Sequence, residues 1–147
     1  MYRLRGATPD DVTFLEELRR SVFQELFVAT FGGWDEARHL RQWSDCWEQG
    51  SIFVIEVNAE RVGMIQLLDE PDTLYVGEFQ VLPSQQRRGL GTQVLRDVLA
   101  QAHAQQRAVS LSLGLKNEGA RRLYTRLGFR DTARSETHYH MTSYPAQ

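Results

Sequence analysis

Two glycines and two arginines stand close together in the middle of this 147-residue chain. The segment reads Gln86, Arg87, Arg88, Gly89, Leu90, Gly91 and Thr92. It follows a β-rich run and opens the most clearly amphipathic helix of the sequence. Glycine lets a phosphate oxygen approach the main chain, and the N–H groups at a helix start attract anions. Because Arg87 and Arg88 add positive charge and Thr92 adds a hydroxyl, we predict a diphosphate site at this turn.

The glycines do not belong to either familiar nucleotide-binding motif. The sequence has no G-x-x-x-x-G-K-[ST] segment, and the turn lacks the first glycine of G-x-G-x-x-G. Taken alone, a G-x-G turn with two solvated arginines is more often structural than functional. The prediction of a diphosphate site therefore depends on the elements around the turn.

Hydrophobic spacing predicts that helices and strands surround the turn in one mixed α/β domain spanning residues 1–147. A helix is expected from near Pro9, because Thr8 can cap it and acidic residues face its positive end. Gly32-Gly33 separates it from a second helix that ends before Gly50. Strands are expected at 52–57, 62–68, about 74–82, 108–113 and 136–142. Two more helices are expected, one after Gly91 and one after Asn117, and the second of these should end at Gly128.

The composition excludes several classes of partner. A formal net charge of -2 gives no general attraction to nucleic acid or to anionic lipid. Cys46 is the single cysteine, so no internal disulfide can form, and a reducing cytoplasm is the expected location. No apolar run approaches the roughly 20 residues that a membrane-spanning helix needs. We expect a soluble protein with a local anion site.

The turn closely resembles a known family motif. Gln86 to Gly91 resembles the Q/R-x-x-G-x-G/A signature of the GNAT acetyltransferase superfamily, which binds coenzyme A. The family's preceding apolar-x-apolar-proline run is matched by Phe79 to Pro83, and its second motif by Asn117 to Phe129. The resemblance implies an α/β (α+β) fold whose mixed, mostly antiparallel sheet is flanked by about four helices. It also implies a splayed strand pair that holds the acyl-CoA.

The resemblance implies an N-acetyltransferase that moves an acetyl group from acetyl-CoA to a primary amine, by direct attack in a ternary complex and without a metal. The residues of the turn from Gln86 to Thr92 would bind the diphosphate. Phe79 and Val81 would lie beside the pantetheine arm, with Val81 pairing through its main chain. Asn117 would contact coenzyme A, although its type and position also suit a helix N-cap.

Two residues are the candidates for catalysis. The resemblance makes Tyr124 a general acid toward the departing thiolate, whereas periodicity alone also fits a tyrosine packed on a helix face. Glu78 is the candidate general base, because it precedes Val81 on the strand that the resemblance places beside the acetyl group. The alternative for Glu78 is a partly exposed strand glutamate. Glu56 and Glu60 fall on the predicted hairpin and are weaker candidates.

Other chemistry-bearing residues fit structural roles better. His138 and His140 share one face of a strand, but no further metal-ligand pattern accompanies them. Trp43 and Trp47 have the spacing of core residues, and Cys46 lacks a recognisable base partner.

The acceptor and the assembly stay open at this point. The region between Val22 and Gln49, which shapes the acceptor site in the family, carries the weakest resemblance. The sequence does not choose among a small amine, a polyamine, an antibiotic, an amino acid and a protein N-terminus, nor between a monomer and a homodimer. The main alternative is a domain that binds acyl-CoA without transfer, either as a sensor or as an interaction domain that presents the complex to a protein partner. A nucleic-acid module is disfavoured by the charge.

Overall fold

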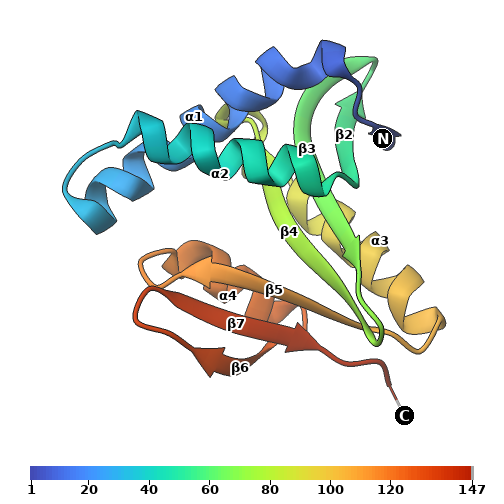
Figure 1. The fold of residues 1–147 in the computed structure, drawn as a ribbon. Coiled ribbons are helices and arrows are strands. Elements are labelled where there is room, and N and C mark those ends of the chain that lie inside the picture. Colours follow the sequence, from blue (N-terminus) through green and yellow to red (C-terminus); the bar gives the residue numbers. More distant parts are fainter. Residues whose placement is uncertain (147) are drawn as a thin grey trace. The chain divides into compact units, whose positions relative to one another are not determined.

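A seven-stranded sheet, with strand order β1-β2-β3-β4-β5-β7-β6, forms the framework of the protein (Figure 1). The computed structural model describes the backbone of residues 1–146 and every side chain among them except those of residues 25, 26, 30 and 31. The strands are β1 (Tyr2–Gly6), β2 (Ile52–Val57), β3 (Glu60–Asp69), β4 (Thr73–Val81), β5 (Ala108–Gly114), β6 (Arg130–Arg134) and β7 (His138–Ser143). The helices are η1 (Pro9–Asp11), α1 (Val12–Phe31), α2 (Glu36–Gln49), η2 (Pro83–Gln85), α3 (Leu90–Ala104) and α4 (Glu118–Arg126).

Strand directions confirm the predicted mixed, mostly antiparallel sheet. The pairs β1–β2, β2–β3, β5–β7 and β6–β7 are antiparallel, whereas β4 and β5 run parallel. The chain divides into two compact units, which we call unit 1 (Met1–Leu67 with Glu78–Leu90) and unit 2 (Leu68–Gly77 with Gly91–Gln147). Within residues 1–146, no helix has the length and apolar character needed to cross a bilayer.

The start of α1 is fixed by a buried carboxylate, Asp11. This residue is 2% exposed, and its side chain accepts two hydrogen bonds from Arg5, at 3.0 and 2.9 Å, and one from the Thr8 N–H at 2.8 Å. Hydrogen bonding from the Arg5 guanidinium holds the pKa of Asp11 well below its usual range. A helical turn begins at Pro9, as the sequence predicted, and this network sets where α1 leaves β1.

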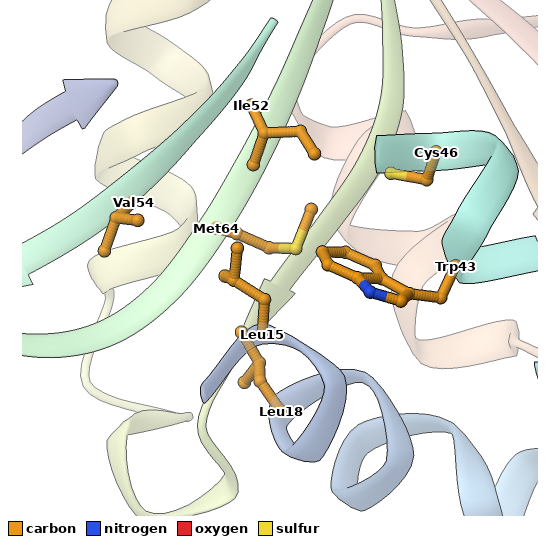
Figure 2. Packing of buried hydrophobic residues seen from close by; sticks show 7 residues of the cluster. All are labelled: Leu15, Leu18, Trp43, Cys46, Ile52, Val54 and Met64. Carbon is orange, nitrogen blue, oxygen red and sulfur yellow. The ribbon is translucent and has the colours of Figure 1, made fainter. Parts of the chain in front are cut away.

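The core of unit 1 lies between two helices and two strands. Figure 2 shows Leu15 and Leu18 of α1 and Trp43 of α2 directed toward Met64 of β3. All of them are less than 5% exposed, so they form one continuous apolar cluster. The cluster is completed by Cys46, Ile52 and Val54. Trp43 is therefore a core residue, as its spacing predicted.

A tight hairpin joins β2 and β3. Val57 pairs with Glu60, so Asn58 and Ala59 alone form the loop, and both have positive φ, 53° and 67°. Positive φ at both central residues is typical of the type I′ turn that matches the twist of a hairpin. The predicted hairpin is confirmed, but the loop is shorter than the residues 58–61 that the sequence suggested.

β3 approaches β4 closely at Gly63. A Cβ atom at Gly63 would lie 2.5 Å from the main-chain oxygen of Gln80 and 3.2 Å from the Cα of Val81. Such distances are too short for a side chain. Only glycine at this position allows β3 to support the end of β4, which carries three of the predicted site residues.

Unit 2 contains the parallel strand pair. Thr73–Val76 of β4 pair with Ala108–Leu111 of β5, and β4 then continues to Val81. β5 also pairs with β7, which in turn pairs with β6. The sequence did not predict β6, because all five of its residues are exposed and it has no apolar alternation.

Candidate functional site

The predicted diphosphate turn has an unusual backbone. After η2 the chain passes through Arg87 with φ 65° and Gly89 with φ 82°, and α3 begins at Leu90. Residues 86–89 are exposed. Main-chain N–H groups that converge in such turns and at a helix start form concave anion sites. The local geometry therefore fits the predicted role of this segment.

Position 89 requires glycine because of its backbone angle, and not because a side chain would lack space. A Cβ at this position would meet no heavy atom within 4 Å. A φ of 82° nevertheless lies in the left-handed region that side chains with a Cβ rarely adopt. A larger residue at Gly89 should therefore change the path of the turn.

Gln86 ties the turn to the end of β4. Its Nε2 donates a hydrogen bond of 2.9 Å to the main-chain oxygen of Val81. The first residue of the signature therefore fixes the turn against the strand that precedes it. Val81 is 9% exposed, so its side chain belongs to the interior while its carbonyl is held by Gln86.

Glu78 lies on β4 within a set of polar side chains. Its Oε1 accepts a hydrogen bond of 3.0 Å from the Arg19 Nε and one of 2.8 Å from the Gln80 Nε2. The Glu78 side chain is 20% exposed and that of Arg19 only 5%. Glu78 is thus neither an isolated surface glutamate nor a free carboxylate, but one half of a largely buried ion pair.

Arg19 also reaches α2. Its NH1 lies 2.9 Å from the Nδ1 of His39, and its NH2 donates a hydrogen bond of 2.8 Å to the Oε1 of Gln42. Because arginine only donates, the Nδ1 of His39 must be the acceptor. Burial, with help from the Arg19 charge, lowers the pKa of His39, so the ring is neutral and its proton sits on Nε2.

Two atoms of this set lack a protein partner. The Nε2 of His39 and the Oε1 of Gln80 are buried and have no hydrogen bond among the described residues. Unpaired buried polar atoms are rare and costly in native proteins, so they point to a function or to bound water. We define the buried polar cluster as Arg19, His39, Gln42, Glu78 and Gln80.

Arg19 and His39 were not among the site residues predicted from the sequence. Leu15, Leu18 and Val22 mark the apolar stripe of α1, and Arg19 lies within it, four residues after Leu15. A charged residue in an apolar helical stripe must find a buried partner, which is the signal that could have identified Arg19. Its partner Glu78 lies 59 positions away, and no local pattern specifies that contact.

His39 makes the stability of the protein sensitive to mild acid. Its folded pKa is below the ordinary value of 6.5, so the unfolded chain binds the proton more readily. The stabilising contribution is complete above about pH 6.5 and is lost as the pH falls, by at most about 1.4 kcal/mol per pH unit. Urea denaturation should show lower stability at about pH 5.5 than at about pH 7.5.

The matched variant for this prediction is His39→Gln, which should flatten that dependence. Asp11, Glu36 and Glu56 also have lowered pKa values, but they take up protons only below about pH 4.5. An equally steep loss of stability in His39→Gln would assign the effect to another histidine.

Tyr124 lies on α4 of unit 2. Its ring packs against Phe129 with the centroids 5.7 Å apart. Burial raises the pKa of Tyr124 to about 12, so the phenol stays protonated at neutral pH and can act as a donor. Within residues 1–146, no protein group forms a hydrogen bond with its hydroxyl.

The N-cap role of Asn117 is confirmed. Its Oδ1 accepts a hydrogen bond of 3.4 Å from the Ala120 N–H at the start of α4. Gly128, with φ 98°, follows the C-cap of the same helix, as the sequence predicted. The contact of Asn117 with coenzyme A stays a prediction.

Several other candidates have structural partners. Burial raises the pKa of the Cys46 thiol to about 12, which makes it a poor nucleophile. The Nδ1 of His140 lies 2.7 Å from the Ser112 Oγ. The residues that the structure describes contain no group of three or more His, Cys, Asp or Glu side chains arranged for a metal ion.

The predicted site residues are distributed over both units. Unit 1 holds Glu78, Phe79, Val81 and the turn as far as Leu90. Unit 2 holds Gly91, Thr92, Asn117 and Tyr124. The turn is one continuous segment of chain, so its two parts are joined directly at the start of α3.

Comparisons with known proteins agree on one family. The family model of the acetyltransferase (GNAT) family matches residues 19–129. The chain is 27% identical over 146 residues to an uncharacterised N-acetyltransferase, MJ1207, of Methanocaldococcus jannaschii. That match covers 88% of this chain and 61% of the relative, so the chain spans about three-fifths of the relative's length.

Solved structures share the fold. PH1933 of Pyrococcus horikoshii superimposes with a TM-score of 0.78 at 20% identity, over 100% of both chains. The PaiA N-acetyltransferase of Thermoplasma acidophilum, crystallised in complex with coenzyme A, gives a TM-score of 0.75 at 13% identity, over 98% of this chain and 99% of its own. With a family model that covers most of its length, this chain belongs to the GNAT acetyltransferase family.

Proposed function

We propose that the protein transfers an acetyl group from acetyl-CoA to a primary amine by direct attack in a ternary complex. The observation that carries the proposal is the turn from Gln86 to Thr92. It combines the family signature with left-handed φ angles at Arg87 and Gly89 and opens directly into α3.

The cofactor would bind along the main chain of β4 and the turn. The main-chain N–H groups from Arg87 to Thr92 bind the diphosphate, with Arg87 and Arg88 adding charge. Phe79 and the Val81 main chain accompany the pantetheine arm, and Asn117 contributes a polar contact from the start of α4. The hydrogen bond from Gln86 to the Val81 carbonyl supports this arrangement, because it fixes the turn relative to β4.

The transfer needs a base and an acid from the protein. The nitrogen also releases its second proton to water as the amide forms, and a proton from water later restores the Tyr124 phenol. Glu78 accepts a proton from the ammonium group of the acceptor, directly or through water, and the neutral nitrogen attacks the thioester carbonyl. A nitrogen–carbon bond forms and the carbon–sulfur bond breaks. Tyr124 gives its proton or a hydrogen bond to the departing thiolate, which its raised pKa of about 12 allows at neutral pH.

The acceptor would bind at the α1–α2 side of unit 1. A cavity of about 340 Å³ lies there, lined by Phe27, Trp34, Asp35, Arg38 and the Gly32-Gly33 turn. The Trp34 ring lies 5.3 Å from the ring of His39 in the buried polar cluster. A side chain of the cavity wall therefore packs directly against the buried polar cluster that contains Glu78. A cytoplasmic location is supported by the free, buried thiol of Cys46.

Initial-rate kinetics test the proposed mechanism. With acetyl-CoA and a reactive amine as the two varied substrates, direct attack should give intersecting double-reciprocal lines. Parallel lines, together with isolation of an acetylated protein, would indicate a covalent intermediate and overturn direct attack.

Glu78→Gln should lower turnover by about 10²-fold at neutral pH. The amide keeps the shape of the side chain but cannot take a proton, so acetyl-CoA affinity should not change. The loss should shrink at alkaline pH, because the acceptor amine then loses its proton without help. Turnover against pH is the measurement, with Glu60→Ala on the exposed hairpin as the control. Full turnover of Glu78→Gln at neutral pH would show that another group is the base.

A non-catalytic acyl-CoA sensor is the second candidate function. It is favoured by the ion pair between Glu78 and Arg19, because the Oε1 of Glu78 is already occupied by donors from Arg19 and Gln80. A sensor should bind acetyl-CoA and release no thiol with any amine of a broad panel. Measured turnover with one amine rejects this alternative.

A further inference from the structure

Arg19 ties three elements of unit 1 together. From α1 it donates to Glu78 on β4 and to both His39 and Gln42 on α2, all at 2.8 to 3.0 Å. A guanidinium presents its donors in a rigid plane, so three bonds in three directions fix its orientation. Arg19 in turn fixes the carboxylate that it contacts.

The burial of the buried polar cluster is unfavourable for folding, as is common for residues that serve a function. The Arg19 and Glu78 charges are largely removed from water, and two further polar atoms of His39 and Gln80 stay buried without a described partner. A buried ion pair is often no more stabilising than apolar residues of similar size. Stability alone therefore does not explain why unit 1 buries these polar residues together with the proposed base, Glu78.

The two donors to Glu78 act on one oxygen. Arg19 Nε and Gln80 Nε2 both bind Oε1, and the side chain keeps 20% exposure. A carboxylate clamped at one oxygen has a fixed plane, so its second oxygen has a fixed direction. Such orientation is what a general base needs to meet the proton of a bound amine.

We infer that Arg19 is a positioning residue that orients Glu78 for proton abstraction from the acceptor. This inference rests on the proposed function. Arg19 does not contact the substrate and acts only through Glu78, while His39 and Gln42 keep its guanidinium in place. Glu78 balances the charge of Arg19, so Arg19 does not offer a binding site for an acidic acceptor.

A double-mutant cycle on turnover tests this inference. Arg19→Gln should lower kcat by about tenfold or more, up to the loss of about 10²-fold expected for Glu78→Gln, with the KM for acetyl-CoA unchanged. The double variant should be no slower than Glu78→Gln alone, because Arg19 has nothing left to orient. Arg19→Lys, which keeps the charge but not the planar donor set, should fall between wild type and Arg19→Gln.

Arg20 supplies the matched control. It is the next residue on α1, and it pairs with Glu17 and with Glu36 of α2, so it also links the two helices. It has no described contact with Glu78 among residues 1–146. Arg20→Gln should therefore keep turnover within about twofold of wild type, since surface ion pairs contribute little.

The outcomes separate the inference from the proposed function. Wild-type turnover in Arg19→Gln, or losses that multiply in the double variant, would overturn the positioning role while acetyl transfer stands. If Arg19→Gln does not fold, Arg19→Lys decides, and full turnover in that variant overturns the role. A wild-type protein that binds acetyl-CoA but acetylates no amine would overturn the proposed function and this inference with it.

Discussion

Replacing Tyr124 with phenylalanine should lower turnover by about 10²- to 10⁴-fold. The substitution removes only the hydroxyl, and no protein group within residues 1–146 forms a hydrogen bond with it. The ring contact with Phe129 stays, so the fold and the affinity for acetyl-CoA should be preserved. The expected loss therefore belongs to the departure of the thiolate and not to binding.

The pH dependence of turnover gives a second test of the role of Tyr124. Burial raises the pKa of Tyr124 to about 12, so the phenol is a donor throughout the range in which enzymes are assayed. The ratio of wild-type to Tyr124→Phe turnover should be constant between about pH 7 and about pH 10. Tyr144→Phe, at an exposed tyrosine, is the control. Unaltered turnover in a chemistry-limited assay would make Tyr124 a packing residue and weaken the enzymatic interpretation.

Gly89→Val should weaken the binding of acetyl-CoA by at least about tenfold. Gly89 has φ 82°, and a β-branched residue held in that region costs roughly 1–3 kcal/mol. The turn should escape this strain by changing its backbone, which turns the main-chain N–H groups away from the diphosphate. Calorimetric titration with acetyl-CoA should show an affinity at least about tenfold weaker than wild type.

A valine at Gly6 is the matched control for Gly89→Val. A Cβ atom at Gly6 would likewise meet no heavy atom within 4 Å, but the φ of Gly6 is outside the left-handed region. Gly6→Val should therefore bind acetyl-CoA like wild type, and Gly89→Ala should lie between the two. Equal affinities for Gly89→Val and wild type would remove the turn from the cofactor site.

Local signals in the sequence were sufficient for most of the fold. Gly32-Gly33, Gly50 and Gly128 mark helix ends, and the structure places Gly32, Gly50 and Gly128 at positive φ where those helices stop. Such signals depend on near neighbours in the chain and can be recognised one segment at a time. β6 has no such signal, because it is an exposed strand whose pairing with β7 is visible only in the folded sheet.

The candidate site was predictable where it follows one segment of chain. The glycines and arginines of the Gln86 to Thr92 turn are contiguous, so their chemistry could be inferred before the structure was known. The environment of Glu78 could not be inferred, because Arg19 and His39 come from α1 and α2 and meet it only through tertiary packing. The left-handed φ of Arg87 was also not predictable, since arginine has no preference for that region.

The mass of an amine after incubation with the purified protein and acetyl-CoA tests the central claim most directly. A panel containing small amines, polyamines, amine-bearing antibiotics, amino acids and peptides with free N-termini covers the open acceptor classes. One class should gain the mass of a single acetyl group in step with release of coenzyme A thiol, and Gly89→Val should form much less of this product when acetyl-CoA is not saturating. Tight binding of acetyl-CoA with no acetylated amine in any class would contradict the central claim.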